Sequence, residues 1–175
     1  MQKYKFSTDE IKKLTNQMVV LVDSREKKND HILEYFIKQG IAFQMEKLEY
    51  GDYSFMIPAS VAGEDIFFHR SIVIERKADL EELSGNLTQQ RERFERELLR
   101  AGNDGAKVYL MIEAPDGFSD VITHKYHTQF TPAAYMASLK TFEHRFDCHI
   151  QFIDKMYAGY FICSTFRYFC RETLK

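Results

Sequence analysis

The chain has 175 residues, of which 45% are hydrophobic and 29% charged, and its formal net charge is −2. This length suits one domain with a full hydrophobic core, and this charge excludes a whole-molecule basic field that would attract nucleic acid. Any nucleic-acid surface must therefore be a local patch. The three cysteines have no CxxC spacing, which argues against a disulfide framework or a zinc site. With no apolar signal segment or membrane-spanning stretch, we expect a soluble, cytoplasmic protein.

Residues 1–17 are expected to form an extension ahead of the main domain. Ser7 and Glu10 have the three-residue spacing of a capping box, which predicts a short helix. The segment is basic at Lys3, Lys5, Lys12 and Lys13. Two interpretations stay open: an arm that contacts DNA, or an extension that packs against the domain.

Apolar runs alternate with helical periods from residue 18 to residue 175, which predicts one α/β domain. Strands are expected over 18–22, 41–48, 54–57, 66–74, 106–113 and 149–153. Helices are expected over 29–39, 78–100 (interrupted near 84–86), 132–146 and 156–172, with a long polar loop over 114–130. Together these elements predict a mixed β-sheet flanked by helices on both faces.

Charged side chains follow the predicted strands at the points where they end. Asp23 follows a buried run, where it can cap the next helix or bind a metal ion. Gly51 suits a turn or bulge that re-aims Asp52. Glu75 ends another apolar run, and Lys77 lies two residues further on the same strand face. Burying an unpaired charge in a core costs several kcal/mol of free energy, so we expect these residues to share one function that requires charge at this place.

Asp23, Asp52, Glu75 and Lys77 predict a catalytic site that holds a divalent cation. Carboxylates held together repel each other unless a cation lies among them. Mg²⁺ prefers one or two carboxylates together with waters and phosphate oxygens, and it lowers the pKa of a bound water. Lys77 can orient or deprotonate that water, or stabilise developing negative charge. We therefore expect the three carboxylates to be metal ligands.

Four basic residues are candidates for binding the substrate. Arg25 follows the first predicted strand, and Lys125 lies in the polar loop, which we expect to face the substrate. Arg93 belongs to a ridge that is either a solvated, salt-bridged helix surface or a surface that faces a phosphate backbone. Arg76 points to the other strand face, where it either pairs with a structural acid or holds a phosphate.

The last predicted helix is apolar on most sides and therefore needs two neighbours. One possibility is full burial within its own domain. The other, which we favour, is a homodimer formed through this helix.

The chain carries five segments in the order of a known family: VDSRE (22–26), LEYGDY (48–53), VIERKADLEEL (73–83), LTQQRERFERELLRA (87–101) and VYLMIEA (108–114). They resemble the nuclease domain of the XPF-type structure-specific endonucleases. The segment 124–146 also looks like the stand-alone versions found in phages and prophages. The resemblance implies a restriction-endonuclease-like fold, in a bacterial or phage-infected cell, with roles in DNA repair or recombination.

The same resemblance implies Mg²⁺- or Mn²⁺-dependent cleavage of DNA phosphodiesters, at branched, flap or fork structures. It implies metal ligation by Asp52 and Glu75, support from Asp23, and a catalytic Lys77. This chain departs from the family pattern ERKxxxD at Glu81, which stands where the family usually has an aspartate. The roles of Glu81 and of Glu26 stay open.

The sequence leaves two alternatives to a nuclease function open. A non-catalytic DNA-binding subunit of the same fold would be expected to have lost part of the acid and lysine set, whereas this chain keeps all of it. An unrelated α/β domain could use the same charges structurally. The chain shows no tandem helix-hairpin-helix module of the kind that larger members use to grip branched DNA.

Overall fold

Seven strands form one mixed sheet in the part of the chain that the computed structural model describes, residues 6–175. The strands are β1 (Val19–Asp23), β2 (Phe43–Glu46), β3 (Tyr53–Ile57), β4 (Ile66–Phe67), β5 (Ile72–Lys77), β6 (Lys107–Glu113) and β7 (Cys148–Ile153). The helices are α1 (Thr8–Asn16), α2 (Asp30–Lys38), α3 (Ala59–Ala62), α4 (Leu80–Leu87), α5 (Arg91–Asp104), α6 (Gly117–Ile122), α7 (Pro132–Phe146), the 3₁₀ turn η1 (Lys155–Tyr157) and α8 (Ala158–Leu174). The predicted mixed sheet is confirmed.

An antiparallel strand lies between two parallel groups. The sheet order is β2-β1-β3-β5-β6-β7, with β4 paired to β3. β1 runs parallel to β2, and β5, β6 and β7 run parallel to one another. β3 is antiparallel to both neighbours, with Tyr53 opposite Val22 of β1 and Ile74 of β5. The start of β3 therefore lies at the same edge of the sheet as the ends of β1 and β5.

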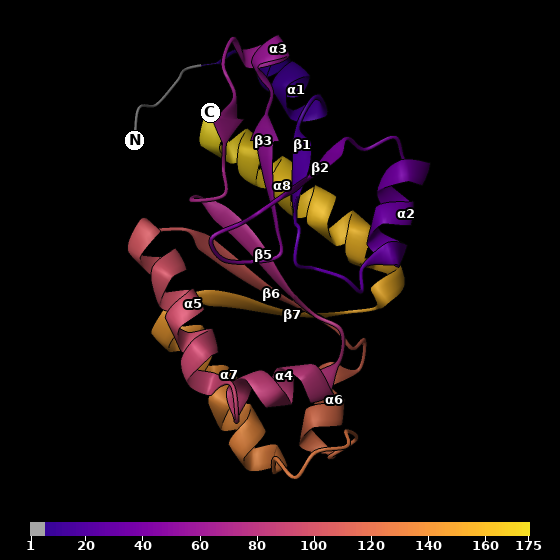
Figure 1. Cartoon of the computed structure of the whole chain (residues 1–175), viewed down its shortest axis with the longest axis vertical. Coiled ribbons are helices and arrows are strands. Elements are labelled where there is room, and N and C mark those ends of the chain that lie inside the picture. The colour runs from indigo at the N-terminus through magenta and orange to yellow at the C-terminus, as the bar shows by residue number, and fades with distance from the viewer. Residues whose placement is uncertain (1–5) are drawn as a thin grey trace.

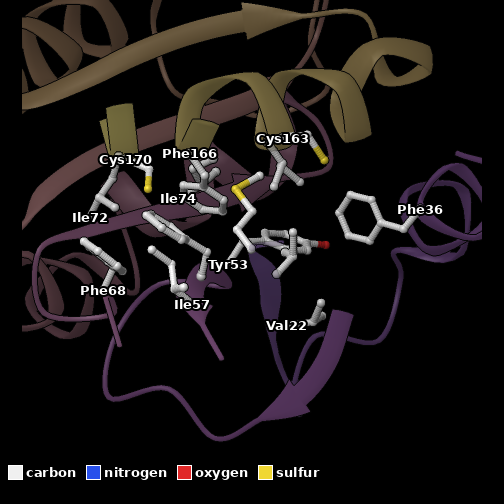
Figure 2. Close-up of a cluster of buried hydrophobic side chains, with 14 of the residues drawn as sticks. Val22, Phe36, Tyr53, Ile57, Phe68, Ile72, Ile74, Cys163, Phe166 and Cys170 are labelled. Atoms are coloured by element: carbon white, nitrogen blue, oxygen red, sulfur yellow. The ribbon is translucent and has the colours of Figure 1, made fainter. Parts of the chain in front are cut away.

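Helices cover both faces of this sheet, with α1, α2 and α8 on one face and α4, α5, α6 and α7 on the other (Figure 1). Figure 2 shows the core under α8, where Phe166 and Cys170 lie near Ile74 and Ile72 of β5. Val73 belongs instead to the core under α4, α5 and α7. Successive side chains of β5 therefore point into the two cores in turn. The same alternation sets the face of the sheet on which each charged side chain at the end of β5 lies.

The last helix buries one side within its own domain. Ile162, Phe166 and Cys170 of α8 have no exposed surface, whereas Tyr160 and Tyr168 on its outer side are 62% and 60% exposed. Intramolecular packing thus accounts for one side of α8, and the homodimer stays a prediction. No helix within residues 6–175 has the length and apolar character needed to cross a membrane.

The expected strand over 66–74 is wrong as one element. Backbone hydrogen bonds from Ser71 and Ile72 to the Phe68 carbonyl turn the chain between β4 and β5. The interruption coincides with the polar sequence His69–Ser71. The expected loop over 114–130 is also wrong in part, because it contains α6, which packs Gly117 against the Phe152 ring.

The N-terminal helix confirms the predicted capping box. The Glu10 carboxylate accepts a hydrogen bond from the Ser7 backbone, and the Ser7 hydroxyl accepts one from the Glu10 backbone. Ile11 and Leu14 are buried against the core under α8, which supports the packing interpretation for this helix. Lys3 and Lys5, which the DNA-arm interpretation needs, lie outside the described residues.

Candidate active site

Backbone hydrogen bonds fix Asp52 between the ends of β1 and β5. Its carbonyl accepts from the Asp23 N–H at 2.7 Å, and its own N–H donates to the Ile74 carbonyl at 2.9 Å. The Arg76 N–H then donates to the Asp52 carboxylate at 2.7 Å. Both the backbone and the side chain of Asp52 are therefore held at the edge of the sheet.

Gly51 makes this placement possible in two ways. Its φ of +73° lies in the left-handed region, which residues with a side chain rarely adopt. A Cβ added to Gly51 would lie 2.7 Å from the Cβ of Val73, inside the packed core. Both the conformation and the close approach to β5 therefore require glycine.

Glu75 and Lys77 project from the same face of β5 and form a buried pair. Lys77 Nζ donates to Glu75 Oε1 at 2.7 Å, and the two side chains are 6% and 12% exposed. The ammonium also lies 4.9 Å from the centre of the Phe94 ring. A carboxylate and an aromatic face together hold the lysine in place.

A cavity of about 240 Å³, here called the edge cavity, contains Asp52, Glu75 and Lys77 in its lining. The opposite wall comes from α4, α5 and the N-cap residue of α5: Glu82, Asn86, Gln90, Arg93, Phe94 and Glu97. Sequence reasoning missed all of these except Arg93. The i, i+4 spacing of Glu82, Asn86 and Gln90 is a signal that could have revealed this polar stripe.

Burial disfavours the charged forms of the Asp52 and Glu75 carboxyl groups. Burial, and then the charge of Glu75, raise the pKa of Asp52 well above its usual range. Burial also raises the pKa of Glu75, although Lys77 opposes the effect. Burial lowers the pKa of Lys77, but Glu75 and Asp52 outweigh it, so that pKa lies above its ordinary value. An added cation near the two acids would favour their charged forms.

The two carboxylates fit a metal ion that is also bound by its substrate. Within residues 6–175, no group of three or more His, Cys, Asp or Glu side chains is arranged to hold a metal ion. Asp52 and Glu75 together form a smaller set. Mg²⁺ is commonly bound through one or two carboxylates, with waters and substrate phosphates as its other ligands. The residues present therefore fit such a partly open site, and they do not form a closed protein cage.

Asp23 is fully engaged by neighbours. Its carboxylate accepts two hydrogen bonds from the Arg25 side chain at 2.8 Å, one from the Arg25 N–H, and one from the Leu48 N–H at 3.0 Å. Burial raises the pKa of Asp23, but these bonds outweigh it and hold the pKa below its usual value. Asp23 does not cap α2, whose N-cap is Asn29. These contacts favour an anchor for Arg25 over a third metal ligand.

Arg76 points to the opposite face, as the alternation of β5 requires. Its guanidinium pairs with both carboxylate oxygens of Glu113, at 2.9 and 2.8 Å, and reaches Glu26 at 3.3 Å. The side chain is 5% exposed. The structure thus supports the structural-acid alternative for Arg76 and makes Glu26 part of the same buried group.

The other predicted DNA-binding residues differ in their relation to the edge cavity. Arg93 lines it and is 72% exposed, with a long 3.4 Å contact to Glu97. Arg25 also lines it and is 59% exposed, although Asp23 holds its guanidinium. Lys125 is 68% exposed and lies 3.8 Å from Asp120, away from the cavity lining.

Glu81 holds a loop instead of facing the acids of the edge cavity. Its carboxylate accepts a hydrogen bond from the His127 N–H at 2.8 Å, and the hydroxyls of Ser84 and Thr128 form a second tie at 2.9 Å. The neighbouring Glu82 lines the edge cavity and Glu81 does not. The first acid after Lys77 that lines the edge cavity is therefore Glu82. It lies one position further along α4 than Glu81, the residue at the position of the family's usual aspartate.

Comparisons with known proteins agree with this architecture. A family model described as "ERCC4 domain" matches residues 22–164. XPF from Aeropyrum pernix is 20% identical, with 87% of this chain and 65% of that chain covered and a TM-score of 0.61. A structure of XPF from Aeropyrum pernix in complex with DNA is 18% identical, with 90% and 67% covered and a TM-score of 0.63. These likenesses confirm the predicted fold, while the chain spans only about two thirds of those proteins. No curated protein matches the chain.

Proposed function

The chain belongs to the ERCC4 domain family, and from this premise we propose that it is a metal-dependent DNA endonuclease that hydrolyses phosphodiester bonds. The observation that carries the proposal is the meeting of Asp52, Glu75 and Lys77 in one cavity at the edge of the sheet. Two of these side chains are carboxylates with raised pKa values, and the third is a buried ammonium. Burying such a group of charges costs desolvation free energy, and groups of this kind with shifted pKa values cluster at functional sites.

In this proposal, Asp52 and Glu75 hold Mg²⁺ or Mn²⁺. When bound, the cation supplies a water of lowered pKa and neutralises charge on the phosphate. The raised pKa of Lys77 favours its ammonium form, which supports a role as a cation that stabilises negative charge over a role as a base. Glu75 orients the ammonium through their 2.7 Å hydrogen bond.

The basic residues at the mouth of the cavity bind the DNA backbone. Arg93 and Arg25 are exposed there and can reach phosphate oxygens. Asp23 supports Arg25, and Lys125 contacts DNA further from the cut. Binding of DNA is extended to this chain from the neighbour described as a complex with DNA. We further propose a preference for branched, flap or fork DNA.

Cleavage of labelled DNA tests this function. Duplex, single-stranded, flap and fork substrates are incubated with the protein in Mg²⁺, Mn²⁺ or EDTA, and the fragments are resolved on a gel. We expect cuts with either metal, none with EDTA, and none above background for Glu75→Gln. Binding of all substrates without any cut, in either metal, would support the non-catalytic subunit instead.

We also propose a homodimer formed through the exposed side of α8, and a cytoplasmic location. The stand-alone phage-type identity stays a prediction from the resemblance. The dimer is supported by the large exposed side chains of η1 and of the outer side of α8: Met156, Tyr157, Tyr160 and Tyr168.

A further inference from the structure

A second set of buried charges surrounds the Arg76 side chain, which points away from Glu75 and Lys77 and, with Glu26, also contributes to the lining of the edge cavity. The side chains of Arg76 and Glu113 are 5% and 2% exposed, and neither lies among the proposed metal ligands. They form a two-pronged ion pair with bonds of 2.9 and 2.8 Å. A buried pair of this kind is weak evidence for stability, because its desolvation cost offsets the attraction. A positioning role would account for a buried pair of this kind.

The backbone of Arg76 connects this pair to the edge cavity. The Arg76 N–H donates to Asp52 Oδ2 at 2.7 Å, while the Arg76 side chain extends to the other face. In the sheet, Arg76 pairs with Met111 of β6, and Glu113 is the last residue of that strand. The side-chain pair therefore ties the end of β5 to the end of β6. It fixes the peptide that holds the Asp52 carboxylate.

Two further residues complete the arrangement. His31 of α2 lies 2.7 Å from Glu113 Oε1 through its Nε2, which donates to the carboxylate. Glu26 accepts from the remaining side of the Arg76 guanidinium at 3.3 Å. His31 is 29% exposed, so the chain of contacts runs from the surface at α2 to Asp52.

We propose that Glu113 is a positioning residue of the active site, which acts through Arg76 to hold the Asp52 carboxylate in its metal-binding orientation. The inference rests on the proposed function. Substitution of residues that orient metal ligands through hydrogen bonds, without touching the metal, typically lowers metal affinity or activity about 10- to 100-fold. Glu113 does not line the edge cavity, so we expect its effect to fall on metal binding and on kcat, and not on KM for DNA.

The test compares Glu113→Gln with the wild type by calorimetric titration of Mn²⁺ into the free protein. We expect the Kd for Mn²⁺ to rise about tenfold. In cleavage assays, we expect kcat to fall, KM for DNA to stay unchanged, and added Mg²⁺ to restore part of the rate. Glu95→Gln is the matched control, because Glu95 accepts from Arg91 and Arg145 on the surface of α5, away from the cavity lining. It should leave Mn²⁺ binding unchanged.

His31→Ala is a second variant in case Glu113→Gln folds poorly, because His31 is partly exposed and its loss leaves the Arg76–Glu113 pair intact. It should weaken Mn²⁺ binding in the same direction but by less. Wild-type cleavage combined with unchanged Mn²⁺ binding in both variants would overturn this inference alone. A wild type that neither binds Mn²⁺ nor cuts DNA would overturn the proposed function as well.

Discussion

The Lys77 ammonium is held 2.7 Å from the Glu75 carboxylate and 4.9 Å from the centre of the Phe94 ring. Each member of the ion pair is nearly excluded from water, so each depends on the other for its charge. Structural and catalytic uses of this pair therefore predict different results when one or both members are removed.

Glu75→Gln leaves the Lys77 ammonium buried without its partner, which should cost about 3 kcal/mol in the free energy of unfolding. The double variant Glu75→Gln/Lys77→Met removes both charges and should recover part of that loss. Cleavage should stay at least about 100-fold below wild type in both, because the double variant restores packing and not chemistry. Urea unfolding and cleavage rates measure the two effects. Recovery of cleavage in the double variant would favour purely structural charges.

The thermal shift caused by Mn²⁺ should grow with pH. Asp52 and Glu75 have raised pKa values, so their protonated forms stabilise the fold at low pH, and that contribution is lost as pH rises through the raised values. A divalent cation replaces the lost protons, so it should raise Tm more at pH 7.5 than at pH 5. Differential scanning calorimetry with and without Mn²⁺ provides the measurement. An equal shift at both pH values would count against these carboxyls as the ligands.

Gly51→Ala should damage both stability and cleavage. Gly105→Ala is a matched control, because Gly105 has the same φ of +73° but open space where its Cβ would lie. The control should lose about 1 kcal/mol from backbone strain alone and should cut DNA normally. Gly51→Ala adds the collision with Val73 and should lose more, with a cleavage defect from the displaced Asp52. Identical losses in the two variants would contradict the close-packing argument.

Arg93→Ala should weaken DNA binding and leave the chemical step intact. Removing one phosphate contact should reduce the slope of log K against log salt concentration by about 1. Arg96→Ala is the control, since Arg96 is also exposed and paired on α5 but does not line the edge cavity. Fluorescence anisotropy at several salt concentrations measures the slope. Equal effects from both arginines would indicate general charge attraction without a defined DNA path.

Tyr160→Glu should convert the proposed homodimer into monomers. A charge placed on the outer side of α8 would be buried without a partner in such an interface. Leu99→Glu serves as the control, because Leu99 is 52% exposed on α5, a different helix. Light scattering coupled to size-exclusion chromatography gives the mass of each variant. A monomeric wild type would remove the basis of this prediction.

Much of the candidate site follows from local sequence. The spacing of Glu75 and Lys77 on a strand places both on one face, and Gly51 marks the close approach that brings Asp52 to them. Alternation also predicted that Arg76 would point away. Its partner Glu113 could not be identified, because the two lie on different strands, 37 residues apart in sequence.

Other features depended on tertiary contacts that a single sequence does not reveal. Glu81 and Glu82 are adjacent acids on α4, and only the packing of the loop near His127 decides that Glu81 is used there. The break before β5 depends on hydrogen bonds to the Phe68 carbonyl. The sequence alone leaves the Asp23 carboxylate available as a metal ligand, whereas in the fold it accepts hydrogen bonds from Arg25 and Leu48.

The antiparallel placement of β3 makes this chain sensitive to length as well as to residue identity. Tyr53 pairs with Val22 on one side and with Ile74 on the other, and Asp52 is the residue just before it. A slip of one residue reverses the face on which every side chain of a strand lies. Inserting or deleting a single residue between Tyr50 and Tyr53 should therefore abolish the site even when every acid and lysine is kept.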